Sequence, residues 1–239
     1  MLCLIIFSFV GDMMNKRIIL YTILFIMILG SILSYFGILQ GRKYTSSEFE
    51  ISVIKSEIDF NNNGFDDYTD ILNGAKMDAK NKPKYKSEYY DGGYPPDDIG
   101  VCSDVIWRAF KEAGYSLKDM IDNDIKNNLD DYDIKVIDNN IDFRRVVNLR
   151  IFFDKYATVL TNDINDIEEW MPGDIVVFDN DKHIGIISNY RNNKGISYVI
   201  HNGGQPVREE NYLIKTKVTK HYRFDASKIE DNVLISWKD

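Results

Sequence analysis

The chain has 239 residues, of which 44% are hydrophobic and 13% aromatic, and its formal net charge at pH 7 is −8. This composition is too apolar for a disordered chain and suffices for one folded domain with a small appendage. Residues 44–239 hold 25 basic and 36 acidic residues, a net charge of −11. Because nucleic acid and anionic lipid would repel so acidic a body, general nucleic-acid binding is excluded as a function class.

An N-terminal apolar segment is long enough to cross a membrane. The 22 residues Ile18–Leu39 carry no charge, and a helix of that length spans the hydrocarbon core of a bilayer. The basic pair Lys16 and Arg17 precedes it, and such a pair usually stays in the cytoplasm. The run is longer than a signal-peptide core, and no small-residue cleavage site follows it. We therefore expect residues 1–43 to be an uncleaved single-pass anchor in the cell membrane, with the rest of the chain extracellular.

Residues 44–82 are expected to form a stalk with a candidate calcium loop at Asp59–Asp70. Oxygen-bearing side chains stand at loop positions 1, 3 and 5, glycine at 6 and a carboxylate at 12, which is the spacing of a calcium loop. The predicted ligands are Asp59, Asn61, Asn63 and Asp70. Asn at two positions and Asp at the twelfth would weaken the site, although extracellular calcium is abundant. The other interpretation, a turn capping a helix from Asp67 to about Lys80, remains open.

Residues 83–239 have the pattern of a mixed α+β domain. A helix is predicted at Ser103–Ala113, where apolar residues share one face and Gly114 follows as a stop. A capping box at Ser116–Asp119 predicts a second helix, and an apolar run within 138–158 predicts a third. Apolar runs predict three strands, the last two joined by a hairpin turn: Asp174–Phe178, Ile184–Ser188 and Tyr198–His201.

One cysteine, Cys102, belongs to the predicted folded body, because Cys3 lies in the N-terminal apolar stretch. A disulfide framework and a cysteine-based zinc site are therefore excluded in the body. Cys102 stands where a loop rich in Gly and Pro enters the predicted helix, and a helix N-terminus lowers a thiol pKa and can hold an oxyanion. A nucleophilic cysteine needs a base, and all three histidines lie downstream, at His183, His201 and His221. An inert buried cysteine is the alternative interpretation.

Several ordered motifs resemble the NlpC-type papain-like fold over about 150 residues, from Tyr89 to the end. They are Tyr89-Tyr-Asp-Gly-Gly93, Cys102-Ser-Asp104, Pro172-Gly-Asp174-Ile-Val-Val-Phe178, His183-Ile-Gly-Ile186 and Val199-Ile-His201-Asn202. One subgroup, the bacterial family catalogued as domain of unknown function 1287, is resembled further at Gly100–Val105, Asp142–Leu149, His201–Gly203 and His221–Arg223. Phe143 departs from that family's pattern, where a histidine is expected. The resemblance implies a nucleophile helix packed on a small antiparallel sheet, and cleavage of peptide or amide bonds, most often in peptidoglycan stem peptides.

The resemblance also implies roles for individual residues. Cys102 is the implied nucleophile and His183 the implied general base. His201 and Asn202 are neighbours on the next predicted strand, so only one of them shares a face with His183, and we expect His201 as the third member. Tyr89 matches a position whose hydroxyl assists the oxyanion, with aromatic packing as the alternative.

Two adjacent arginines, Arg144 and Arg145, are candidates for binding a substrate carboxylate, with local ion pairs as the alternative. Asp104 is expected to have a structural role in the first turn of the nucleophile helix. No phosphate-binding loop or zinc-protease motif occurs, so we expect catalysis without a cofactor and calcium only as a structural ion.

Together these features predict a membrane-anchored extracellular cysteine hydrolase that cleaves peptide or amide bonds through a thioester intermediate. Its expected partners are a cell-wall peptide or peptidoglycan substrate and the membrane, and not nucleic acid. Two other classes stay open. One is a papain-like acyltransferase or lipid hydrolase. The other is a non-catalytic, calcium-dependent cell-wall-binding module in which Cys102 is merely buried.

Overall fold

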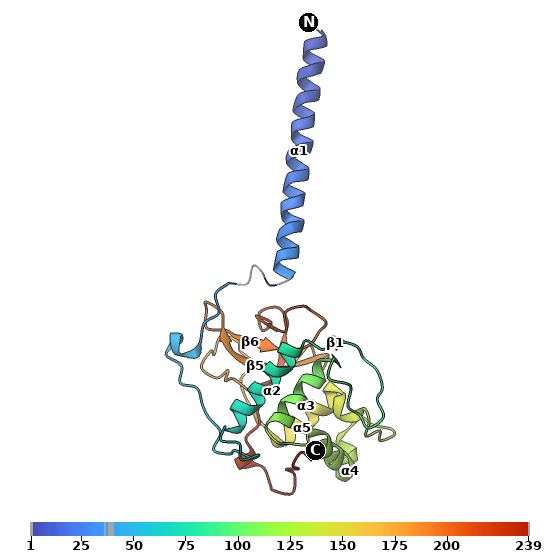
Figure 1. Ribbon diagram of the computed structural model, residues 1–239, viewed down its shortest axis with the longest axis vertical. Helices are drawn as coiled ribbons and strands as arrows, with labels where there is room; N and C mark the ends of the chain where they lie inside the picture. Colours follow the sequence, from blue (N-terminus) through green and yellow to red (C-terminus); the bar gives the residue numbers. More distant parts are fainter. Residues whose placement is uncertain (1, 36, 38–40, 239) are drawn as a thin grey trace. The chain divides into compact units, whose positions relative to one another are not determined.

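The structure is a computed structural model that describes residues 2–35, 37 and 41–238, with side chains of the first helix described for Lys16–Ser34. The chain divides into two compact units, Met1–Gly41 and Arg42–Asp239, and each is described by itself. Figure 1 shows the long first helix and the mixed α+β second unit.

The first unit is the helix α1 (Leu2–Tyr35). Its segment Lys16–Ser34 is long and apolar enough to cross a membrane, by length and composition, and no part of that segment is buried within the protein. The predicted apolar helix is therefore present. Residues 36, 38 and 39 of the predicted span lie outside the described residues.

The second unit is built on a six-stranded antiparallel sheet with the order β3-β8-β4-β5-β6-β7. Its strands are β3 (Thr158–Val159), β4 (Ile175–Phe178), β5 (His183–Arg191), β6 (Ser197–Ile200), β7 (Glu209–Glu210) and β8 (Val218–Arg223). A short parallel pair, β1 (Lys84–Tyr85) and β2 (Ile99–Gly100), lies just before Cys102 in the chain. The three predicted strands are confirmed as β4, β5 and β6.

Both faces of the sheet are buried, which explains the unbroken apolar run in β4. Ile175 and Val177 lie in the larger hydrophobic cluster, which the helices share. Val176 and Phe178 lie in a smaller cluster around Trp170. Because side chains alternate faces along a strand, a strand that is covered on both sides is apolar at every position.

The described residues of the second unit form the helices α2 (Asp67–Asn81), α3 (Cys102–Glu112), α4 (Leu117–Asn127) and α5 (Val146–Tyr156). Helices α2, α3 and α5 contact strands of the sheet, whereas α4 packs on α3 and α5. The helix predicted from Asp67 and the one predicted at Ser103–Ala113 are confirmed as α2 and α3. Helix α3 packs against α2 and β5, and Figure 1 shows α2 beside α3. Short 3-10 turns occur at Ser46–Phe49, Leu129–Asp131, Asp142–Arg144 and Ala226–Lys228.

Residues 42–66, which precede α2, belong to the same compact unit as the sheet. The backbone of Tyr44 forms two hydrogen bonds with Arg191 in β5, of 2.9 and 2.8 Å. The Arg191 guanidinium is buried and donates to the hydroxyl of Ser46 and to the carbonyls of Ile167 and Trp170. The segment between Arg42 and α2 is therefore attached to the sheet.

Candidate active site

Cys102 is the first residue of α3 and is 7% exposed. The residue before it, Val101, is extended and caps the helix, and its backbone N–H donates to Asp104 Oδ2 at 2.8 Å. Extended backbone followed at once by a helix leaves the N–H groups of Cys102 and Ser103 without partners inside the helix. These groups are directed toward the start of the helix, where the Cys102 thiol lies.

Asp104 is completely buried and is held by four donors. Besides Val101 N–H, its oxygens accept from Trp107 Nε1 at 2.8 Å and from Arg144 Nε and Nη2 at 2.8 and 2.9 Å. Arg144 also donates to the carbonyl of Glu88 at 3.0 Å, and its side chain is 2% exposed. The guanidinium is thus bound within the fold, at the base of the nucleophile helix. Arg145 differs: its side chain is 57% exposed and lies 3.4 Å from Asp142.

The two histidines singled out from the sequence lie in contact. His183 Nε2, at the start of β5, is 2.8 Å from His201 Nδ1, just after β6. The other ring nitrogen of His201, Nε2, is 3.2 Å from Glu210 Oε1 in β7, and Glu210 in turn pairs with Lys215. The structure therefore aligns two imidazoles and a carboxylate across β5, β6 and β7. Sequence reasoning missed Glu210, because a two-residue polar strand has no readable periodicity.

Cys102 and His183 approach the start of β5 from different sides. Cys102 belongs to the larger cluster with Ile184 and Ile186, whereas His183 pairs across the sheet with Phe178 of the smaller cluster. Among the described residues no hydrogen bond joins the Cys102 thiol to an imidazole, and the link between the two sites is the backbone N–H of Ile184, directed at Cys102. Catalytic hydrogen bonds are often long in a free enzyme and tighten when substrate binds.

Burial determines the protonation states of the Cys102 thiol and the His183 imidazole in the free protein. It raises the pKa of the Cys102 thiol to about 11, although the backbone N–H groups of Ile184, Ser103 and Cys102 favour the thiolate. Burial, followed by the neighbouring His201, lowers the pKa of His183 to about 3. The expectation that the helix N-terminus lowers the thiol pKa is therefore wrong, because desolvation outweighs the helix N–H groups. At neutral pH the pair consists of a thiol and a neutral imidazole.

Asn202 has different partners from His201. It is fully buried, and its amide donates to the carbonyls of Gly100 and Pro83 at 3.0 and 3.2 Å. Its own oxygen accepts from the backbone N–H of Gly204 at 3.1 Å. The amide thus ties the loop after β6 to the backbone that leads into Cys102. Because successive side chains of an extended segment point in opposite directions, His201 lies beside His183 and Asn202 does not.

Two of the tyrosines that precede the nucleophile helix, Tyr89 and Tyr85, lie in different surroundings. The hydroxyl of Tyr89 donates to Asp138 at 3.1 Å and accepts from the Asn140 amide at 2.8 Å, and its side chain is exposed. Tyr85, in β1, is the one near the thiol: burial, then the charge of the Cys102 thiolate, raises the pKa of its phenol. Sequence reasoning selected Tyr89 from motif position, since nothing local shows that β1 pairs with β2 and places Tyr85 by Cys102.

The four predicted calcium ligands are close together. The amides of Asn61 and Asn63 contact Asp70 Oδ2 at 3.3 and 2.9 Å, and Asp59 accepts from the backbone N–H groups of Asn63 and Gly64. Two of the four are amides, and the described residues contain no group of three or more His, Cys, Asp or Glu side chains suited to a metal. A bound cation would require the amides of Asn61 and Asn63 to turn, so that their oxygens and not their NH₂ groups face the side of Asp70. With only two carboxylates among the four ligands, the set fits a calcium site of low negative charge.

The same loop also holds the far end of α3. The Asn61 amide donates to the Glu112 carbonyl at 2.7 Å, and Phe60 stacks on Tyr115 with ring centroids 4.1 Å apart. Asp66, not a predicted ligand, caps α2 by accepting from Thr69. Both open interpretations of the loop, calcium site and helix-capping turn, are thus compatible with these contacts.

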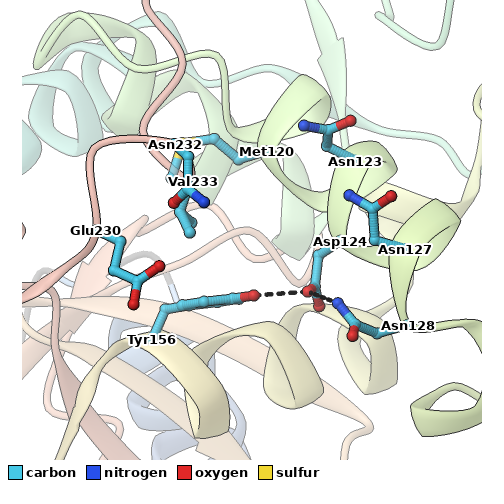
Figure 2. Close-up of a pocket in the computed structure, with 9 residues that line it drawn as sticks. All are labelled: Met120, Asn123, Asp124, Asn127, Asn128, Tyr156, Glu230, Asn232 and Val233. Carbon is cyan, nitrogen blue, oxygen red and sulfur yellow. Dashed lines mark hydrogen bonds between the residues drawn. The ribbon is translucent and has the colours of Figure 1, made fainter.

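A separate cavity of about 290 Å³ lies between α4, the end of α5 and the C-terminal segment. Figure 2 shows the Asp124 carboxylate accepting from Tyr156 and Asn128 within it, at 2.7 Å each. Its lining contains neither cysteine nor histidine: Met120, Asn123, Asp124, Asn127, Asn128, Tyr156, Glu230, Asn232 and Val233. Thiol chemistry is therefore not located there.

Comparison with known proteins places this geometry in a family. A family model described as domain of unknown function (DUF1287) matches residues 72–224, which hold α3, His183, His201 and Glu210. The uncharacterized protein YijF of Escherichia coli (strain K12) is 34% identical over 149 residues, which cover 59% of this chain and 72% of that protein. No solved structure matches. The chain belongs to the DUF1287 family.

Proposed function

We propose that this protein is a cysteine hydrolase of the NlpC papain-like type, anchored by α1 with its second unit outside the cell. Its substrates are peptide or amide bonds, in peptidoglycan stem peptides. The observation that carries this proposal is the row His183, His201 and Glu210, which begins one residue from the N–H group directed at Cys102. A thiol at a helix N-terminus and an imidazole oriented by further polar groups are the parts that nucleophilic cysteine catalysis requires.

The resting protonation states define the first step. Because Cys102 is a thiol and His183 is neutral, the thiol proton passes to His183 as sulfur attacks the carbonyl carbon. The oxyanion that forms faces the first N–H groups of α3, and Tyr85 is a further donor near the thiol. The imidazolium then protonates the leaving amine as the C–N bond breaks, which leaves a thioester on Cys102. Water, deprotonated by His183, hydrolyses the thioester and restores the thiol.

The location outside the cell rests on the basic pair that precedes the apolar part of α1. Lys16 and Arg17 flank its N-terminal end, and positive charge favours the cytoplasmic side. The second unit would then face the cell wall. Its acidic charge makes a neutral or basic wall component a better partner than an anionic polymer.

Purified full-length protein in detergent, incubated with muropeptides and analysed by mass spectrometry, tests the proposal. We expect new shorter peptides with the wild type and with Cys3→Ser, and none with Cys102→Ala. The Cys3 variant is the matched control, because it removes the other cysteine of the chain. Cleavage by Cys102→Ala at more than about a thousandth of the wild-type rate would contradict covalent catalysis, because losing a nucleophile costs far more than that.

The same preparations separate the rival classes. A panel of acyl esters detects acyltransferase or lipid hydrolase activity, which would depend on Cys102 just as peptide cleavage does. Binding to whole cell-wall material that is unaffected by Cys102→Ala, without cleavage of either substrate type, would favour the non-catalytic module.

A further inference from the structure

Glu210 is the last member of the row formed by His183, His201 and Glu210. It lies in β7, is 9% exposed, and has Oε1 3.2 Å from His201 Nε2 while its other oxygen pairs with Lys215. Hydrogen bonds from His201 and Lys215 outweigh the effect of burial and keep the pKa of this carboxyl below its ordinary value. At neutral pH Glu210 is therefore a carboxylate, which can accept hydrogen bonds but cannot donate them.

This fixes the protons along the row of side chains. Facing a carboxylate, His201 Nε2 must carry a proton, so the Nδ1 atom of a neutral His201 has a free lone pair. That lone pair lies 2.8 Å from His183 Nε2, which must then be the donor. The remaining nitrogen of His183, Nδ1, is left unprotonated. An unprotonated Nδ1 is the state that a general base needs.

The other groups facing His201 do not choose between its tautomers. The Gln205 amide nitrogen is 3.2 Å from both ring nitrogens and donates to the His201 carbonyl at 3.1 Å. The ring of Tyr212 packs on both imidazoles, with centroids 4.1 Å from His201 and 5.4 Å from His183. The charged groups nearby are Lys215, which pairs with Glu210, and Arg208, which donates to the Gln205 and Pro83 carbonyls. Glu210 is thus the group that determines which ring nitrogen of His201 carries the proton.

We propose that Glu210 is a positioning residue that sets the tautomer of His201 and, through it, makes Nδ1 the basic nitrogen of His183. The effect of Glu210 on catalysis rests on the proposed function, but the positions of the protons on the two histidines can be measured without a substrate. Without the carboxylate, His201 is free to carry its proton on Nδ1. His183 then has to present a lone pair at Nε2 and a proton at Nδ1, which blocks it as a base. In a serine-protease triad, an orienting acid replaced by its amide costs about 10⁴ in rate for this reason.

The test uses the full-length chain in detergent, carrying Cys3→Ser and labelled with ¹⁵N-histidine. Ring-nitrogen chemical shifts report directly which nitrogen holds the proton. We expect Nε2–H on both His183 and His201 in the parent, and a gain of Nδ1–H on His201 in Glu210→Gln, whose amide can donate to Nε2. Glu210→Ala should give a mixture of the two forms. Iodoacetamide alkylation of Cys102 at pH 7 should slow by about tenfold or more in both variants, as expected for a lost general base.

Glu209→Ala is the matched control. Glu209 is the neighbouring residue in β7, but its carboxylate pairs with Ser188, Lys43 and Lys76 instead of a histidine. It should leave both tautomers and the alkylation rate unchanged. Folded Glu210→Gln and Glu210→Ala with the parent tautomers would overturn the role of Glu210. A parent protein with the expected tautomers but a Cys102 indifferent to His183→Gln would instead refute the proposed function and leave the tautomer assignment intact.

Discussion

Arg144 and Asp104 form a bidentate ion pair at the base of the nucleophile helix, with both side chains almost completely buried. Asp104 at the same time accepts the N–H of Val101, the residue directly before Cys102. The pair therefore connects the 3-10 turn before α5 to the point where the chain enters α3. It orients the thiol through the backbone. Three of the five N–H groups of the Arg144 guanidinium donate within the fold, and the side chain is only 2% exposed, so its contacts are structural.

This arrangement separates the two arginines that sequence analysis grouped as substrate-binding candidates. Arg144→Ala leaves Asp104 as a buried charge without its partner, so we expect the free energy of unfolding to fall by about 3–5 kcal/mol. Arg145→Ala removes an exposed side chain and should change it by less than about 0.5 kcal/mol. Denaturant unfolding followed by tryptophan fluorescence measures both. Equal stability of the two variants would show that the Asp104 pair is not formed.

The lowered pKa of His183 predicts how stability depends on pH. Because burial keeps His183 neutral down to about pH 3, whereas a histidine in the unfolded chain takes up its proton near pH 6.5, the unfolded state binds more protons between these values. Stability should therefore be complete above about pH 6.5 and decline as the pH falls below it. His183→Gln should flatten this decline relative to the wild type in thermal melts. Parallel pH profiles for the two proteins would contradict a buried neutral His183.

Calcium should raise the melting temperature if the Asp59–Asp70 loop closes around the ion. Asp59 carries one of the two ligand carboxylates, so we expect the shift in the wild type and its loss in Asp59→Ala. Asp66→Ala is the control: it removes the cap of α2, so it should lower the melting temperature but keep the calcium shift. Identical wild-type curves with calcium and with chelator would leave the helix-capping turn as the correct interpretation.

Much of the local structure could be predicted from the sequence, because it follows from local periodicity. The pattern within a segment was enough to predict that segment in several cases. These are the apolar face of α3, the acidic start of α2 and the apolar runs of β4, β5 and β6. Helix α3 begins and ends one residue earlier than predicted, at Cys102 and Glu112 instead of Ser103 and Ala113. The capping box predicted at Ser116 takes a different form, in which its hydroxyl bonds the Asp119 carboxylate at 2.7 Å.

The parts that were missed depend on contacts between distant residues. Glu210 meets His201 only because β7 pairs with β6, and Tyr85 lies near enough to feel the charge of a Cys102 thiolate only because β1 pairs with β2. Neither short strand has enough residues for a periodic pattern. The pKa of Cys102 was predicted in the wrong direction for a related reason. Helix position is visible in the sequence, but burial by Ile184 and its neighbours is a property of the packed sheet.

The central claim is that His183 acts as the base for Cys102, and alkylation kinetics test it without a substrate. Full-length protein carrying Cys3→Ser is treated with iodoacetamide across a range of pH, beside the same protein with His183→Gln. We predict that the parent reacts at least about tenfold faster at neutral pH, and that the two rates converge as the pH approaches the thiol pKa of about 11. Equal rates at neutral pH in two folded proteins would contradict the account.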